Sequence, residues 1–323
     1  MDMEYLFFLQ GLREATNGIF DEFFNMISKI AVDIMPILPF LVYWAIDKSW
    51  GYRFLGTQWG GELINGTVKL TVCAYRPWIR DPRIVPAGDS KVAATGYSFP
   101  SGHTMCATAN YGSTFVWQRK KRKLLAAGCC VLIALTGFSR NFLGVHTPQD
   151  VIVGFLETSI IIIIAGFIQK KVEGNGGLAD KLTICGVIFS VGVIVYILVK
   201  SYPMDYVDGE LLVDPQKMMK DTFSGAGGFI GLMVGSYIER HYVKYEIPKG
   251  SSSLPVMVCV GTACVFIWER YLAAITFKIW FGANWGSFIS SLIMIMLGVV
   301  VFPICIMNAA KKETSQAVVQ ENP

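Results

Sequence analysis

Long, uninterrupted apolar runs limit the folds open to this sequence. A helix needs about 20 mostly apolar residues to cross a bilayer. Only 16% of the 323 residues are charged, against about a quarter in ordinary soluble domains. Nine segments approach the required length, at residues 25–46, 54–75, 102–118, 124–139, 150–169, 182–199, 222–239, 255–275 and 285–308. The sequence therefore predicts an all-α fold, a polytopic transmembrane helical bundle of about nine spanning helices.

Lysine and arginine predict how this bundle is oriented, because short cytoplasmic loops are enriched in both. The strongest signal is the basic run at residues 119–123, and the Lys and Arg near residues 48–53, 170–171, 240–249 and 311–312 fall on the same side. The loop around residues 200–221 carries Asp205, Asp208, Glu210 and Asp214 and falls on the outer side. We expect the N-terminus outside, the C-terminus inside, and a multi-pass protein of the plasma membrane.

The two ends of the chain differ from its apolar middle. Residues 1–24 mix acidic side chains with leucine and phenylalanine, which favours an interfacial amphipathic segment. Residues 311–323 are polar, and we expect a disordered cytoplasmic tail there. Gly227, Gly231 and Gly235 repeat every four residues, the spacing of a close-packed helix face. We interpret that stripe first as packing within the chain, and second as the contact of a homodimer.

Two of the three histidines fall at predicted outer membrane boundaries. His103 follows Ser101 and Gly102, where Ser101 is a good N-cap and Gly102 lets the backbone approach a ligand closely. Unpaired amides at a helix start attract phosphate, and His103 beside them could protonate a leaving oxygen. Taken alone, this string also fits a plain helix cap beside an interfacial histidine.

His146 and Asp150 are four residues apart at the expected start of another helix. Thr147 is a suitable cap and Pro148 suits the first helical position. At this spacing Asp150 can bond one ring nitrogen of His146 and leave the other nucleophilic. The simpler interpretation makes Asp150 a capping carboxylate of the first turn, and both roles are compatible.

Three cations accompany the histidines: Lys69, Arg76 and Arg140. Guanidinium groups bind phosphate through paired donors, and lysine acts as a point charge. Lys69 lies within an apolar segment, and it shares a face with Arg76 if that helix persists over seven residues. Snorkelling to the interface explains the two arginines equally well, but explains Lys69 less well.

Together, Lys69 to Arg76-Pro77, Pro100-Ser101-Gly102-His103, and Ser139-Arg140 to His146 and Asp150 resemble the type 2 phosphatidic acid phosphatase superfamily. The resemblance covers roughly residues 54–169. It implies that His146 attacks phosphorus, that Asp150 orients His146, and that His103 protonates the leaving group and then activates water. It also implies that Lys69, Arg76, Arg140, Ser101 and the Gly102 amide hold the phosphate oxygens. We expect no metal and no cofactor.

This resemblance assigns residues 25–199 to a phosphatase-like catalytic core and residues 200–310 to additional transmembrane helices. The expected activity is hydrolysis of a lipid phosphomonoester or polyprenyl diphosphate on the extracytoplasmic face. Candidate substrates are phosphatidic acid, phosphatidylglycerol phosphate and undecaprenyl diphosphate, and membrane lipids are the expected neighbours. The net charge of +4 is modest, and the sequence has no basic stripe interleaved with stacking aromatic residues, which argues against nucleic-acid binding.

Alternatives remain open at this point. Nine helices with an outer N-terminus resemble the glucose-6-phosphatase branch, which implies a soluble sugar phosphate as substrate. Vanadate haloperoxidases share the motifs, but those members are soluble, and the apolar runs argue against them. A transporter or a non-catalytic lipid-binding protein is the alternative from another class, although the sequence shows no inverted repeat of broken helices.

Overall fold

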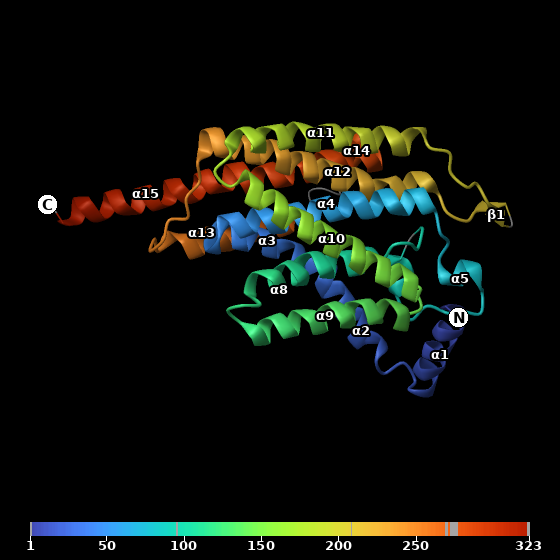
Figure 1. The fold of residues 1–323 in the computed structure, drawn as a ribbon. Helices are drawn as coiled ribbons and strands as arrows, with labels where there is room; N and C mark the ends of the chain where they lie inside the picture. Colours follow the sequence, from blue (N-terminus) through green and yellow to red (C-terminus); the bar gives the residue numbers. More distant parts are fainter. Residues whose placement is uncertain (1, 95, 208, 269–270, 272–276, 322–323) are drawn as a thin grey trace.

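The computed structural model describes residues 2–94, 96–207, 209–268, 271 and 277–321, and the chain is helical through most of these (Figure 1). The α-helices are α1 (Asp2–Ala15), α2 (Asp21–Lys29), α3 (Leu38–Leu41), α4 (Lys48–Val72), α5 (Pro77–Arg80), α6 (Ser90–Ala93), α7 (Gly102–Ala107), α8 (Ser113–Gln118), α9 (Lys123–Phe142), α10 (Pro148–Val172), α11 (Gly176–Val199), α12 (Pro215–Ile238), α13 (Ser253–Ile267), α14 (Lys278–Met296) and α15 (Phe302–Glu321). Short π or 3-10 turns continue several of them: η1 (Ile30–Ile34), η2 (Met35–Ile37), η3 (Val42–Ile46), η4 (Thr108–Gly112), η5 (Glu239–Val243) and η7 (Leu297–Val301). The strands β1 (Tyr206–Val207) and β2 (Glu210–Leu211) pair antiparallel in the loop before α12.

Helix α12 packs against α14, α4 and α11. The glycine stripe of α12 is what lets α14 come close. A Cβ at Gly227 would lie 2.1 Å from the Phe288 carbonyl oxygen, and one at Gly231 would lie 2.8 Å from that of Leu292. Gly235 faces Met296 further along α14. The interpretation as packing within one chain is therefore confirmed.

Five helical stretches among the described residues are long and apolar enough to cross a membrane: Asp21–Ile46, Lys123–Phe142, Pro148–Val172, Gly176–Val199 and Lys278–Gln316. The predicted count of about nine spans is not confirmed. Helices α4 and α12 have 25 and 24 residues, yet they carry more polar side chains than a span facing lipid. Helix α13 is a shorter apolar helix, and part of the predicted segment 255–275 lies outside the described residues.

The two ends of the bundle carry different features (Figure 1). The N-terminus, α5 and β1 lie at one end, and the C-terminus and the α8–α9 connection lie at the other. Near the first end, Arg13 of α1 donates to the Val85 carbonyl oxygen at 2.5 Å, so the N-terminal segment is attached to the long loop before α7. This end also holds the motif residues described below.

At the other end, a carboxylate ties three parts of the chain together. Glu239 is fully buried and accepts a hydrogen bond from the Lys48 ammonium at 2.6 Å. It also accepts from the Tyr52 hydroxyl at 2.9 Å and the Tyr245 amide at 2.7 Å. A buried charge with this many partners is satisfied, and removing it would leave the lysine uncompensated.

The C-terminal segment differs from the expectation. Helix α15 continues to Glu321, whereas the sequence suggested disorder from residue 311. Glu313 explains part of the order, because its carboxylate accepts hydrogen bonds from the amides of Ser252 and Ser253 at the start of α13. Glu313 therefore supplies hydrogen-bond partners to the N-terminus of a neighbouring helix, as a capping residue does.

Candidate active site

Three stretches that are distant in the sequence meet at the end of the bundle that holds the N-terminus: the loop after α4, the start of α7, and the α9–α10 connection. Two contacts hold the second and third together. The Ser101 amide donates to the Asp150 carbonyl oxygen at 2.9 Å. A Cβ at Gly154 would lie 2.7 Å from the Ser101 carbonyl oxygen, so α10 can approach α7 this closely only with glycine there.

Arg76 reaches the site from a loop. Helix α4 ends at Val72 because Cys73 adopts a left-handed conformation with φ of 54°. The helix does not persist to Arg76, so the condition under which Lys69 and Arg76 would share a helix face is not met. Arg76 is 4% exposed, and its Nη1 donates to the Val145 carbonyl oxygen at 2.9 Å. The same Nη1 lies 2.8 Å from His146 Nε2.

These contacts assign the tautomer of His146. A guanidinium can only donate hydrogen bonds, so His146 Nε2 must accept from Arg76 and carries no proton. The ring proton then sits on Nδ1, which lies 3.2 Å from Asp150 Oδ2. Burial, followed by the charge of Arg76, lowers the pKa of His146 well below its usual value. The imidazole is therefore neutral, with its lone pair on the nitrogen that faces away from the carboxylate.

Asp150 serves two purposes at once. It is the third residue of α10, and its Oδ2 accepts from the Thr147 amide at 2.8 Å, which completes a capping box with Thr147. The same Oδ2 accepts from the Ser98 hydroxyl at 2.5 Å. The capping and orienting interpretations of Asp150 are thus geometrically compatible. Sequence reasoning missed Ser98, whose only signal was its place just before the Pro100-Ser101-Gly102-His103 string.

Arg140 is a buried cation with donors left over. It is 1% exposed, and its Nη1 donates to the Ser28 hydroxyl at 3.1 Å. Its Nε and Nη2 have no hydrogen-bond partner among the described residues. Unsatisfied buried donors are rare in folded proteins and call for an explanation such as a missing ion. A phosphate group beside Arg140 would supply the acceptors.

Ser101, Gly102 and His103 occupy the start of α7 as expected. The Ser101 side chain accepts from the Thr104 amide, so the predicted N-cap is confirmed. A Cβ built on Gly102 would lie 3.8 Å from Lys69 Nζ, which places the lysine directly beside this glycine. The charges of Arg140, Arg76 and Lys69 all act on His103. All eight predicted residues therefore gather in one region, and their chemical roles stay predictions.

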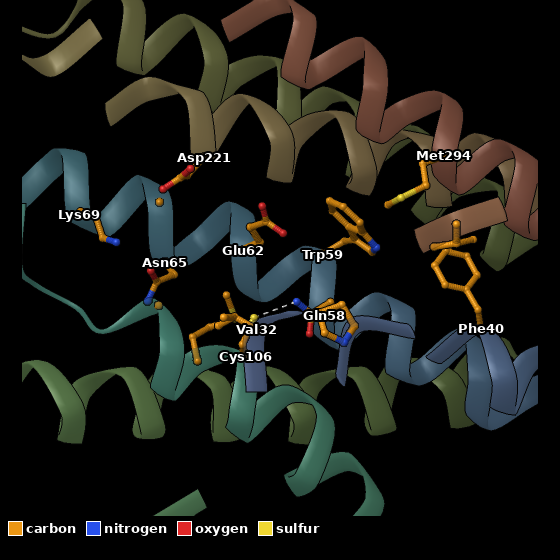
Figure 2. Close-up of a pocket in the computed structure, with 15 residues that line it drawn as sticks. Val32, Phe40, Gln58, Trp59, Glu62, Asn65, Lys69, Cys106, Asp221 and Met294 are labelled. Atoms are coloured by element: carbon orange, nitrogen blue, oxygen red, sulfur yellow. Dashed lines mark hydrogen bonds between the residues drawn. The ribbon is translucent and has the colours of Figure 1, made fainter. Parts of the chain in front are cut away.

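A cavity of about 270 Å³ opens beside Lys69 and Gly102 (Figure 2). Asn65 and Asp221 lie near Lys69 at one end, whereas Phe40 and Met294 lie at the other. The cavity thus connects the predicted phosphate site with the interior of the bundle. Within the described residues, no group of three or more His, Cys, Asp or Glu side chains is placed to hold a metal ion.

Comparisons with known proteins agree with the motifs. Residues 52–172 match the family model of the PAP2 superfamily. The chain is 33% identical over 133 residues to the phosphatidylglycerophosphatase B of Bacillus subtilis, an alignment that covers 37% of this chain and 64% of that protein. It is 33% identical over 84 residues to the Escherichia coli K12 protein of the same name, covering 25% of this chain and 32% of that protein. The Haemophilus influenzae protein is 42% identical over 84 residues, covering 24% and 35%.

The alignments span less than two thirds of each of these relatives. No solved structure matches the chain. All eight predicted site residues, from Lys69 to Asp150, fall inside the family match. The match to the PAP2 superfamily therefore covers the part of the chain that holds the whole predicted site.

Proposed function

We propose that this protein is an integral membrane phosphatase that hydrolyses a lipid phosphomonoester or polyprenyl diphosphate through a phosphohistidine intermediate. The observation that carries the proposal is the pairing of His146 Nδ1 with Asp150 Oδ2 at 3.2 Å, which leaves Nε2 unprotonated. A neutral imidazole oriented by a carboxylate is the arrangement that nucleophilic catalysis by histidine requires. Residues 25–199 would form the catalytic core, and residues 200–310 would complete the bundle.

The geometry suggests how substrate binding would activate the nucleophile. In the free protein, Arg76 donates to Nε2 and so occupies the lone pair of His146. An incoming phosphate offers stronger, charged acceptors to Arg76 and to the unpartnered donors of Arg140. The lone pair is then free to attack phosphorus in line, while Lys69 adds a third positive charge near the oxygens.

Bond breaking needs a proton at the leaving oxygen. Burial and the three nearby cations favour the neutral form of His103 in the free protein. A bound phosphate would supply the negative charge that lets His103 take up a proton, and we assign it as the general acid. Attack by Nε2 forms a nitrogen–phosphorus bond as the phosphorus–oxygen bond of the ester breaks. His103, now neutral, takes a proton from water, whose oxygen attacks phosphorus and releases inorganic phosphate from Nε2.

The membrane supports a lipid substrate. Five described helices can span a bilayer, and the relatives that align are named phosphatidylglycerophosphatase B. The Lys and Arg pattern predicts that the basic α8–α9 connection is cytoplasmic. The site lies at the opposite end of the bundle, which would then be the outer end. A lipid phosphate with its tail in the outer leaflet would present its head group at this level of the bundle.

A soluble phosphate ester is the second candidate. The polar end of the cavity beside Lys69 favours it, because Asn65, Glu62 and Asp221 line space that a purely apolar ligand would not use well. A sugar phosphate would reach the site from water rather than from the bilayer. The hypothesis of a lipid phosphate substrate has the additional support of the aligned relatives.

A phosphate-release assay on detergent-purified protein tests both candidates. The panel is phosphatidylglycerol phosphate, phosphatidic acid, undecaprenyl diphosphate and glucose 6-phosphate, each with and without a chelator. We expect release from a lipid in the presence of chelator, and its loss in the His146→Ala variant. His241→Ala is the matched control, because His241 lies in η5 away from the site and pairs with Asp180 at 3.0 Å.

Two outcomes would overturn the proposal. Full activity in His146→Ala would remove the assigned nucleophile. Turnover of glucose 6-phosphate as fast as any lipid would replace the lipid substrate with a soluble one.

A further inference from the structure

A polar stripe runs along α4 inside the bundle. Gln58, Glu62, Asn65 and Lys69 are spaced by four, three and four residues, so they share one helix face. All four line the cavity, and at about 1.5 Å per residue the stripe is about 16 Å long. It therefore leads from the predicted phosphate site into the interior of the bundle.

A carboxylate on α4 in the interior of the bundle requires an explanation. Glu62 lies near the middle of the 25-residue helix α4, far from either end. Ionisable side chains at membrane depth are costly, and they usually face a polar cavity and mark a substrate pathway. Glu62 faces the cavity between Asn65 and Trp59 (Figure 2).

A second carboxylate comes from outside the family match. Asp221 belongs to α12, and it lines the same cavity near Lys69 (Figure 2). Helices α4 and α12 touch at this level, since a Cβ at Gly66 would lie 2.5 Å from the Thr222 hydroxyl oxygen. The charge of Asp221 acts on both Lys69 and Arg76. The helices after residue 172 thus contribute a charged group beside the predicted phosphate site.

The chemistry of the lining selects among ligands. The carboxylates of Glu62 and Asp221 line one cavity, and carboxylates accept hydrogen bonds well from hydroxyl groups. Asn65 holds the Glu157 carboxylate at 2.5 Å, and Gln58 accepts from Asn110 at 2.8 Å, so the amides of the stripe are fixed in place. Trp59 adds an aromatic surface against which an alcohol skeleton can pack.

The size of the cavity agrees with this selection. A volume of about 270 Å³ has room for a glycerol unit or a single sugar ring.

We propose that this cavity binds the hydroxyl-bearing alcohol portion of the phosphate ester, with Asp221 and Glu62 as acceptors for its hydroxyl groups. Asp221 is then a specificity-determining residue supplied by α12. The inference rests on the proposed phosphatase function. The same chemistry fits two sources, the glycerol of a lipid head group and a free polyol phosphate.

Two matched substrate pairs test the inference. The lipid pair is phosphatidylglycerol phosphate, whose leaving alcohol bears a free hydroxyl, against phosphatidic acid with the same acyl chains. The soluble pair is glycerol 1-phosphate against propyl phosphate. The readout is the ratio of kcat/KM within a pair, which cancels any loss of folded protein. A hydrogen bond to a charged group contributes about 1.5–3 kcal/mol, so Asp221→Ala should lower the ratio at least about tenfold in the pair that the cavity serves.

Further variants sharpen the result. Glu62→Gln should lower the same ratio by a smaller factor, because an amide oxygen still accepts a hydrogen bond. Glu210→Gln is the matched charge control, since Glu210 is an exposed carboxylate in β2 and does not line the cavity. It should leave both ratios unchanged.

The outcomes separate the two proposals. The charge of Asp221 acts on Lys278 at the start of α14 as well as on Lys69. An Asp221→Ala variant that loses activity equally on both members of each pair would make Asp221 a counter-ion of these lysines, and would overturn the inference. Unchanged ratios would overturn it as well. If the unmodified protein released phosphate from none of the four esters, the proposed function itself would fail.

Discussion

Replacing Arg140 with methionine should abolish activity and yet leave the protein at least as stable. Arg140 is buried, and among the described residues only one of its three side-chain nitrogens has a hydrogen-bond partner. That partner, Ser28, keeps a second contact to the Ser139 hydroxyl at 2.6 Å when the arginine is removed. Methionine fills much of the same volume without a charge or an unsatisfied donor.

The magnitudes follow from the number of donors. Two charge-assisted hydrogen bonds to phosphate, at about 1.5–3 kcal/mol each, amount to about 3–6 kcal/mol of substrate and transition-state binding. At about 1.4 kcal/mol per tenfold, kcat/KM should fall roughly 10²- to 10⁴-fold. On the stability side, the two unsatisfied buried donors cost about 1–3 kcal/mol each, and the lost bond from the charged Arg140 to Ser28 contributes about 1.5–3 kcal/mol. The free energy of unfolding should therefore stay level or rise.

Thermal unfolding in detergent, with and without vanadate as a phosphate mimic, measures both effects. A ligand at 100 times its Kd stabilises by about 2.7 kcal/mol, and a 100-fold weaker Kd reduces this to about 0.4 kcal/mol. We expect Arg140→Met to show the higher Tm without vanadate and almost no shift with it. If the variant were destabilised by more than about 2 kcal/mol without ligand, Arg140 would be a structural cation and the reasoning would be refuted.

Three further predictions concern other parts of the molecule. Ser98→Ala removes a hydrogen-bond donor to the Asp150 carboxylate and should lower kcat about tenfold with little change in KM. An unchanged kcat in a phosphate-release assay would show that Asp150 does not need the hydrogen bond from Ser98. The pKa of His146 is lowered by burial and by Arg76, so the unfolded chain takes up a proton near pH 6.5 that the folded chain does not. The free energy of unfolding should therefore fall as pH drops below about 6.5, and less steeply in His146→Gln; equal slopes in unfolding titrations would contradict this. Glu239→Gln removes the negative charge that pairs with Lys48, whose side chain is 34% exposed, and should cost about 1.5–3 kcal/mol of stability while the folded fraction keeps its kcat. A lower kcat per folded molecule would link this end of the bundle to the site.

Much of the candidate site could be predicted from residue types and spacing. The caps at Ser101 and Thr147 are local features, set by which side chain can reach a nearby amide, and the structure has both. The four-residue spacing of His146 and Asp150 is local in the same way. Ser98 was not predictable, because its contact with Asp150 depends on how the loop before α7 folds back across the α9–α10 connection.

The position of Arg76 in the loop after α4 could not be predicted from the sequence either. A helical continuation from Lys69 was a reasonable expectation, but Cys73 ends α4 in a left-handed conformation that favours glycine far more than cysteine. The tertiary contacts of Arg76 with Val145 and His146 accompany that turn. The conformation at Cys73 thus depends on long-range contacts, and no local sequence pattern predicts those contacts.

The count of spans and the cavity have a common physical origin. Hydropathy identifies helices that face lipid, and it ranks α10 and α11 among the clear spans because their exposed faces are almost wholly apolar. Helix α4 lies between α10 and α12 and buries many of its own residues, so its outer surface is protein rather than lipid. A helix in that position can carry Gln58, Glu62 and Lys69 toward an internal cavity without exposing them to acyl chains. The polarity that keeps α4 out of a hydropathy count is therefore the same property that lets it line an internal cavity.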